Sequence, residues 1–207
     1  GATKNQNFIK RWKARVGEAE ATRIKNHSAS RGTAMHKFLE HHVLGTGYED
    51  LTSIGNEARP MANKIIEVGL APVAEYYGSE VMLHYPGLYA GSTDLICLHN
   101  SKETVVDFKQ SNRPKKKEWI EDYYLQISAY AMAHDYVYGS QIQQGVIMVC
   151  TPDLYYQEFK VEGLELRKYK HKFLKRLDMY NELIHDEKER AKVDPDKLLK
   201  EFEKDKS

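Results

Sequence analysis

The spacing of apolar residues predicts helices in the first third of the chain. Residues 5–28 are polar and basic, with scattered apolar positions that suit a helix. A second helix is expected to begin near Arg31, with Ser30 as its N-cap, and to end at Gly45. A third helix is expected over 56–77. The chain is therefore predicted to start with helices and to continue with a different kind of structure.

From residue 79 onward the pattern becomes that of strands interrupted by one helix. Helices are expected over about 117–138 and from Leu164 to about Lys192, and the last dozen residues are expected to be loosely ordered. This order predicts an α/β fold in which a small mixed sheet is flanked by helices. The expected strands cover 79–85, 88–98, 103–110, 142–150 and 154–161.

The length of 207 residues suits a single domain. Its expected parts are a basic, mainly helical region over 1–77, a sheet with its crossover helix over 78–162, and a helix with a tail over 163–207. No apolar run is long enough to cross a bilayer, and no secretory signal opens the chain. The two cysteines, Cys97 and Cys150, lie in strand-like runs, which favours core thiols in a reducing, cytoplasmic location.

Two acidic residues occupy apolar strands that form an expected hairpin. A two-residue turn at Asn100-Ser101, a composition suited to positive φ, places Asp94 directly opposite Asp107. Their Cβ atoms would then lie about 5 Å apart. Because buried carboxylates at that separation repel one another, the pair favours a divalent cation, and Lys109 adds a further positive charge.

Such a site suits the hydrolysis of a phosphodiester bond, because a divalent cation polarises the phosphoryl oxygen and assists the deprotonation of water. Lys109 would orient or activate that water, or stabilise the transition state, and the sequence leaves the choice open. On its own, Asp107-Phe108-Lys109 would equally suit a surface ion pair. The opposed Asp94 favours the metal site.

Further polar residues are ambiguous when each is taken alone. Gln126 and Tyr130 share a helix face and suit phosphate binding or support of Lys109, although a core Tyr and an exposed Gln are the alternative. His36, one turn before Glu40, suits metal ligation or an ordinary polar position.

Positive charge is concentrated locally, although the net charge is only +1. The first 37 residues carry a basic excess, and a second basic run extends from Arg113 to Lys117. Such stripes suit a phosphate backbone or simply a solvated surface.

In chain order, these residues resemble the motifs of the RecB-like branch of the PD-(D/E)XK nuclease superfamily, especially its phage-type and mitochondrial exonucleases. The match spans about residues 31–130. The residue before Asp94 is Thr93 rather than the Pro of the superfamily's name, a departure that is common in this branch. The motifs are Gly32-Thr-Ala-Met-His36, Asp94, Asp107-Phe-Lys109 and Gln126-Ile-Ser-Ala-Tyr130.

The resemblance implies a restriction-endonuclease-like core that binds Mg²⁺ or Mn²⁺, as one or two ions, and in which Asp94, Asp107 and Lys109 are catalytic. An iron–sulfur cluster, present in some relatives, would need four cysteines and is excluded by two. The expected metal ligands are His36, Asp94, Asp107 and the backbone carbonyl of Phe108. The residues expected to contact DNA or support the site are Gln126, Tyr130, Arg31, Thr33, Arg113 and Lys115.

The sequence therefore predicts a metal-dependent exodeoxyribonuclease that acts on linear DNA with free ends in replication, recombination or repair, with a phage-like source. No nucleotide cofactor is expected, because the chain lacks G-x-x-x-x-G-K-[ST]. The alternatives are a structure-specific endonuclease of the same fold and a non-catalytic DNA-binding module. The oligomeric state is left open.

Overall fold

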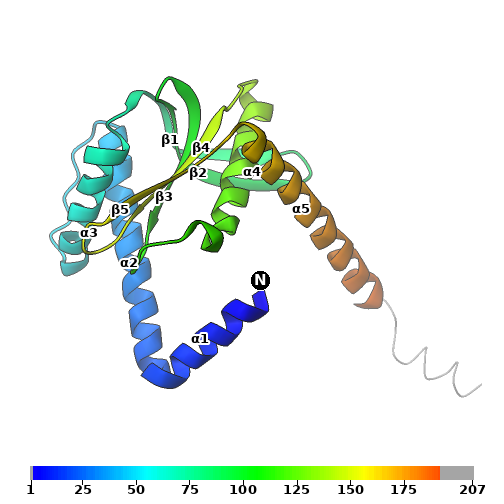
Figure 1. Cartoon of the computed structure of the whole chain (residues 1–207), viewed down its shortest axis with the longest axis horizontal. Coiled ribbons are helices and arrows are strands. Elements are labelled where there is room, and N and C mark those ends of the chain that lie inside the picture. Colours follow the sequence, from blue (N-terminus) through cyan, green and yellow to red (C-terminus); the bar gives the residue numbers. More distant parts are fainter. Residues whose placement is uncertain (1, 192–207) are drawn as a thin grey trace, which may run out of the picture.

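Figure 1 shows a central sheet with α2 and α3 on one side and α4 and α5 on the other. The structure is a computed structural model that describes residues 2–191. Its elements are α1 (Ala2–Val16), α2 (Glu18–Val43), α3 (Ser53–Lys64), the π-helical turn η1 (Ile65–Gly69), β1 (Val73–Tyr85), β2 (Tyr89–His99), β3 (Lys102–Gln110), the 3₁₀ turn η2 (Lys117–Trp119), α4 (Glu121–Tyr138), β4 (Gln144–Cys150), β5 (Tyr156–Glu162) and α5 (Gly163–Ala191).

The five strands lie in the sheet in the same order as in the chain, β1-β2-β3-β4-β5. Neighbouring strands are antiparallel except β3 and β4, which are parallel and are joined by the crossover helix α4. Two parallel strands need such a crossover, because the chain leaves the first strand at one end of the sheet and must return to the opposite end to begin the second. The predicted α/β class and mixed sheet are therefore confirmed.

Alternation along the central strands divides the core into two layers. Val106 and Phe108 pack in the layer beneath α2 and α3, whereas Val105 packs in the layer beneath α4 and α5. Because side chains alternate along a strand, Asp107 and Lys109 point away from the layer that holds Phe108, as the sequence predicted. Cys97 and Cys150 are buried, free thiols, which confirms their expected core role.

The expected division of the N-terminal helices is wrong. The break falls at Gly17, which has φ of 86° and separates α1 from α2. Ser30 is not an N-cap but lies inside α2, which runs through the middle of the predicted boundary. A positive φ interrupts a helix regardless of the apolar pattern around it, whereas a serine followed by helix-compatible residues does not. The expected end near Gly45 is confirmed.

The helix expected over 56–77 is also wrong at its end. The Thr52 side chain caps α3 at its start, and the helical path closes with a π turn that ends at Gly69. A Cβ on Gly69 would lie only 2.7 Å from Met148 Sδ, so the chain passes very close to β4 there. Tertiary packing therefore ends the helix although the apolar pattern continues into β1, which begins at Val73.

The expected loose order of the last dozen residues falls outside the described part of the chain. Within residues 2–191, every helix is too short or too polar to cross a membrane.

Candidate active site

The β2–β3 hairpin positions the two acidic residues. Its turn consists of Asn100 and Ser101, whose φ values of 48° and 61° match a two-residue turn of the kind that favours a right-handed strand twist. The ladder runs from His99 opposite Lys102 to Leu95 opposite Val106. The predicted turn and register are therefore confirmed.

The ladder ends where the acidic residues begin. Beyond Leu95 and Val106, the Asp94 carboxylate takes over as a hydrogen-bond partner of β3 and accepts from the Phe108 backbone N–H at 2.6 Å. Backbone pairing between β2 and β3 thus stops at this end of the hairpin. The Asp94 side chain, and not a backbone carbonyl of β2, accepts the hydrogen bond from the Phe108 N–H.

Asp107 is almost fully buried, with 4% of its surface exposed. The Lys109 ammonium lies 2.8 Å from Asp107 Oδ2 and forms an ion pair with this buried carboxylate. Burial raises the pKa of Asp107 to about 6, against the lowering effect of the Lys109 charge. A buried carboxylate such as that of Asp107 would be stabilised by a further positive charge nearby.

His36 reaches the open end of the hairpin from α2, which is anchored by the buried side chains of Met35 and Leu39. Its Nε2 lies 2.8 Å from the Phe108 carbonyl, and its Nδ1 lies 3.4 Å from Asp94 Oδ1. When Nε2–H donates to the carbonyl in the neutral ring, Nδ1 keeps a lone pair directed at Asp94. This is the orientation that second-sphere hydrogen bonds give to metal-binding histidines.

The two partners shift each other's titration. Burial lowers the pKa of His36, but the neighbouring Asp94 outweighs it and leaves the pKa raised. Burial likewise opposes ionisation of Asp94, yet His36 and the Phe108 N–H lower its pKa. The two acids are therefore shifted in opposite directions, and Asp94 loses its proton at a lower pH than Asp107.

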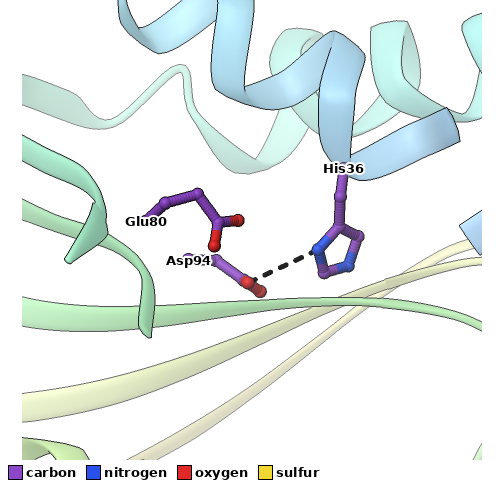
Figure 2. Close-up of side chains that lie close together, drawn as sticks. All are labelled: His36, Glu80 and Asp94. Atoms are coloured by element: carbon purple, nitrogen blue, oxygen red, sulfur yellow. Dashed lines mark ion pairs between the residues drawn. The ribbon is translucent and has the colours of Figure 1, made fainter. Parts of the chain in front are cut away.

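Glu80 is a site residue that the sequence analysis missed. It lies on β1, and its φ of 49° is rare for a non-glycine residue within a strand. Figure 2 shows its carboxylate beside that of Asp94 and facing His36. Glu80 is exposed, and partial removal from solvent, followed by the Asp94 charge, raises its pKa. The strand pattern gave no signal for it, because a charged residue in an edge strand is ordinarily solvent-facing.

The resulting donor set fits a hard divalent cation. One ligand atom from each of His36, Glu80 and Asp94 lies within 4.8 Å of the others. Two carboxylates and one imidazole suit Mg²⁺ or Mn²⁺ better than a thiolate-preferring metal. Asp107 lies outside this group of three, and the Phe108 carbonyl already contacts His36.

Gln126 and Tyr130 connect α4 to the catalytic lysine candidate. Gln126 Oε1 accepts from Lys109 Nζ at 3.4 Å, and Gln126 Nε2 donates to Tyr130 Oη at 2.9 Å. The Tyr123 ring, which the sequence analysis did not single out, lies 5.2 Å from Lys109 Nζ. The lysine is thus held from two sides, by a carboxylate on its own strand and by α4.

Arg31 and Thr33 occupy different environments on α2. Arg31 is 5% exposed and donates to Gln110 Oε1 at 3.0 Å and to Asn112 Oδ1, so it ties α2 to the end of β3. Thr33 is exposed and lines a 360 Å³ cavity together with His36 and Glu80. The site therefore opens toward solvent on the Thr33 side.

Arg113 and Lys115 line a neighbouring 510 Å³ groove with Trp12 and Arg15 of α1. Ser28 and Gln110 line both this basic groove and the cavity at the site, so the two hollows are neighbours. The residues that line the groove in the described chain include no carboxylate.

Sequence comparison reveals relatives among the exonucleases. Mitochondrial genome maintenance exonuclease 1 of Mus musculus is 32% identical over 189 residues, which cover 84% of this chain and 54% of the relative. The chain is homologous to this exonuclease. The Xenopus tropicalis mitochondrial genome maintenance exonuclease 1 is 28% identical over 160 residues, covering 70% of this chain and 44% of that protein. The chain spans about half the length of these relatives. The resemblance to mitochondrial exonucleases stated from the motifs is confirmed.

Family models and solved structures resemble the chain less than these two sequence relatives do. No family model matches the chain. A proposed exonuclease from Eubacterium rectale superposes with a TM-score of 0.47 at 11% identity over 72% of this chain and 64% of that one. An alkaline exonuclease from Laribacter hongkongensis gives a TM-score of 0.29 at 14% identity over 76% and 84%.

Proposed function

We propose that this protein is a metal-dependent exodeoxyribonuclease that hydrolyses phosphodiester bonds at the ends of linear DNA. The observation that carries the proposal is the meeting of His36, Glu80 and Asp94 beside the buried Asp107–Lys109 pair. Homology to mitochondrial genome maintenance exonuclease 1 supports it independently. A structure-specific endonuclease would use the same residues, and the names of the relatives favour action at ends.

His36, Glu80 and Asp94 would hold Mg²⁺ or Mn²⁺, with Asp107 and the Phe108 carbonyl at the border of the site. The bound cation would polarise the phosphoryl oxygen and favour deprotonation of the attacking water. Asp107 keeps the Lys109 side chain directed into the site, and Gln126 limits its movement.

The protonation state of Lys109 favours one of its alternative roles. Burial lowers its pKa, but the charge of Asp107 outweighs burial and leaves the pKa raised. A lysine that stays protonated near neutral pH donates hydrogen bonds and does not accept a proton. The raised pKa favours the roles in which Lys109 orients the water or stabilises the charge on the phosphate.

The DNA strand would enter along the basic groove. Arg113 and Lys115 would contact backbone phosphates, because the groove combines cations with an absence of described carboxylates. Buried Arg31 would act indirectly by holding Gln110, and exposed Thr33 lies where the strand would pass.

A role in replication, recombination or repair follows from such an activity. The expected cytoplasmic location and phage-like source stay predictions.

The test is digestion of linear and circular DNA, single- and double-stranded, in Mg²⁺, Mn²⁺ or EDTA. We expect metal-dependent loss of linear DNA, with circles spared. Asp107→Ala or Lys109→Ala should lower the rate at least a hundredfold, because each removes an interaction aimed at the reacting phosphate.

Glu158→Ala and Lys160→Ala are matched controls, since this pair has the same spacing on a strand, with Nζ and Oε1 3.1 Å apart, and lies on β5. Both should keep the wild-type rate. Cutting of circles would support the endonuclease instead. A wild-type protein that binds DNA but leaves every substrate intact in both metals would refute catalysis and favour the binding module.

A further inference from the structure

A second cavity, of 420 Å³, lies between the start of β2 and the helices α4 and α5. The two helices lie side by side in Figure 1, and α5 continues outward past the rest of the molecule. The volume falls in the range of small-ligand sites, about 300–1,000 Å³. None of the metal-binding candidates lines this cavity.

The walls of the cavity are mostly aromatic and aliphatic. The Tyr89 ring is fixed in place, because its hydroxyl donates to the Ala129 carbonyl at 2.8 Å and Phe173 packs edge-on with ring centroids 4.9 Å apart. Tyr180 of α5 also lines the cavity and is 60% exposed. Such walls suit a flat apolar group that can lie against rings.

The charge at the cavity excludes a phosphate as its preferred occupant. Arg176 is the basic residue of the lining, and it already donates to Asp122 Oδ1 at 2.8 Å and to Glu121 Oε2 at 3.2 Å. Two carboxylates therefore neutralise one guanidinium. The cavity favours a neutral group with polar edges, in contrast to the basic groove that Arg113 and Lys115 line.

The cavity is joined to the proposed active site by two shared side chains. Gln126 and Tyr130 line the cavity, and Gln126 also accepts from Lys109. The Tyr130 ring lies directly over Gly91 of β2, where an added Cβ would be 2.9 Å from Tyr130 Cε1. A strand whose phosphate lies at Lys109 thus has a cavity for one of its bases behind the Gln126–Tyr130 pair.

We infer that this cavity receives one unpaired nucleobase of the DNA strand, next to the phosphate at Lys109. The inference rests on the proposed function and assigns Tyr180 and Phe173 as stacking residues of the base subsite. Stacking on aromatic rings tolerates any base, so the subsite would select an unpaired base without selecting a sequence.

The test measures binding of a fluorescein-labelled oligothymidylate in EDTA, where hydrolysis does not interfere. One abasic residue is moved along the oligonucleotide from its end. We expect one position at which the abasic residue weakens binding by about 5- to 100-fold, the effect of losing one stacked base. Tyr180→Leu should weaken binding of the intact oligonucleotide by a similar factor and abolish the difference made by the abasic residue.

Two exposed residues serve as controls. Met179→Ala alters the neighbouring position on α5, and Tyr155→Leu removes an exposed aromatic ring after β4; neither residue lines the cavity. Both variants should bind the intact and abasic oligonucleotides as the wild type does. Abasic effects that are absent at every position, or that simply add to the effect of Tyr180→Leu, would overturn the inference. Position-dependent binding in a protein that hydrolyses nothing would support the subsite and refute only the nuclease.

Discussion

Asp107 is nearly completely buried, and burial outweighs the ion pair with Lys109 in setting its pKa. In the absence of a metal, its ionised form is therefore unfavourable, and its folded-state pKa of about 6 lies above the ordinary value of 3.8. A carboxyl group shifted in this direction destabilises the folded protein increasingly as the pH rises from about 4 to 6. The residue is well suited to a cation and poorly suited to the metal-free fold.

Asp107→Asn should therefore stabilise the metal-free protein at pH 8. Because burial disfavours the ionised form of Asp107, replacing it by a neutral amide should raise the Tm. The gain should disappear below about pH 4, where Asp107 is protonated in both states. Thermal unfolding in EDTA between pH 4 and pH 8 measures it, with Glu118→Gln as an exposed control. A variant less stable than the wild type at pH 8 would contradict the proposed strain.

Glu80 shows at the residue scale what the sequence could not reveal. Asp94, Asp107 and Lys109 could be found because two apolar strands and one turn determine their relative positions. Glu80 depends instead on a positive φ within β1, and a strand pattern assumes that every residue has extended backbone. His36 was found only through its helix motif, since no local rule brings α2 to the Phe108 carbonyl.

Among the elements, the best-predicted ones were those governed by local chemistry. The Asn100-Ser101 turn fixed the hairpin register, and the crossover helix followed from a continuous helical pattern. The errors arose where packing decides. The apolar pattern does not stop at Gly69, but the chain must pass close to Met148 and therefore turns. Gly17 was the overlooked breaker of the first helix.

The contact between β2 and α4 gives a prediction at the element scale. Gly91→Ala would place a Cβ 2.9 Å from Tyr130 Cε1, so the ring must move and its hydrogen bond with Gln126 must weaken. We expect nuclease activity to fall at least tenfold, because Gln126 also positions Lys109. Stability should fall by about 1–3 kcal/mol as an overpacking cost.

Gly47→Ala is the matched control for this change, since an added Cβ there meets no atom within 4 Å. Initial rates and thermal unfolding of both variants provide the measurements. Full activity in Gly91→Ala would show that the orientation of Tyr130 does not matter for the reaction.

At the scale of the whole molecule, a nearly neutral protein presents a locally basic groove. Its net charge is +1, yet Arg15, Arg113 and Lys115 line one hollow without a described carboxylate. Local charge, and not the total, determines how strongly a phosphate backbone is held. The groove shares Ser28 and Gln110 with the cavity that His36 and Glu80 line, so the basic surface borders the proposed active site.

Arg113→Gln combined with Lys115→Gln should weaken DNA binding and reduce its dependence on salt. For single-stranded DNA, each lost phosphate contact lowers the slope of log K against log salt by about 0.7, so the double variant should lose about 1.4. Binding in EDTA at several salt concentrations measures the slope. Lys168→Gln, at an exposed position of α5, should leave it unchanged. An unaltered slope in the double variant would exclude the groove as the binding path.

The locality of the β2–β3 hairpin has a consequence for the order of folding. Phe108 and Asp94 are only 14 residues apart, whereas His36 contacts Phe108 across 72 residues. Because closing a short loop loses less chain entropy, the hairpin can form before α2 docks on the sheet. The two carboxylates would then meet before their imidazole partner arrives. We therefore expect their repulsion at neutral pH to slow the formation of this hairpin, and folding to be faster at a pH where the carboxyl groups are protonated.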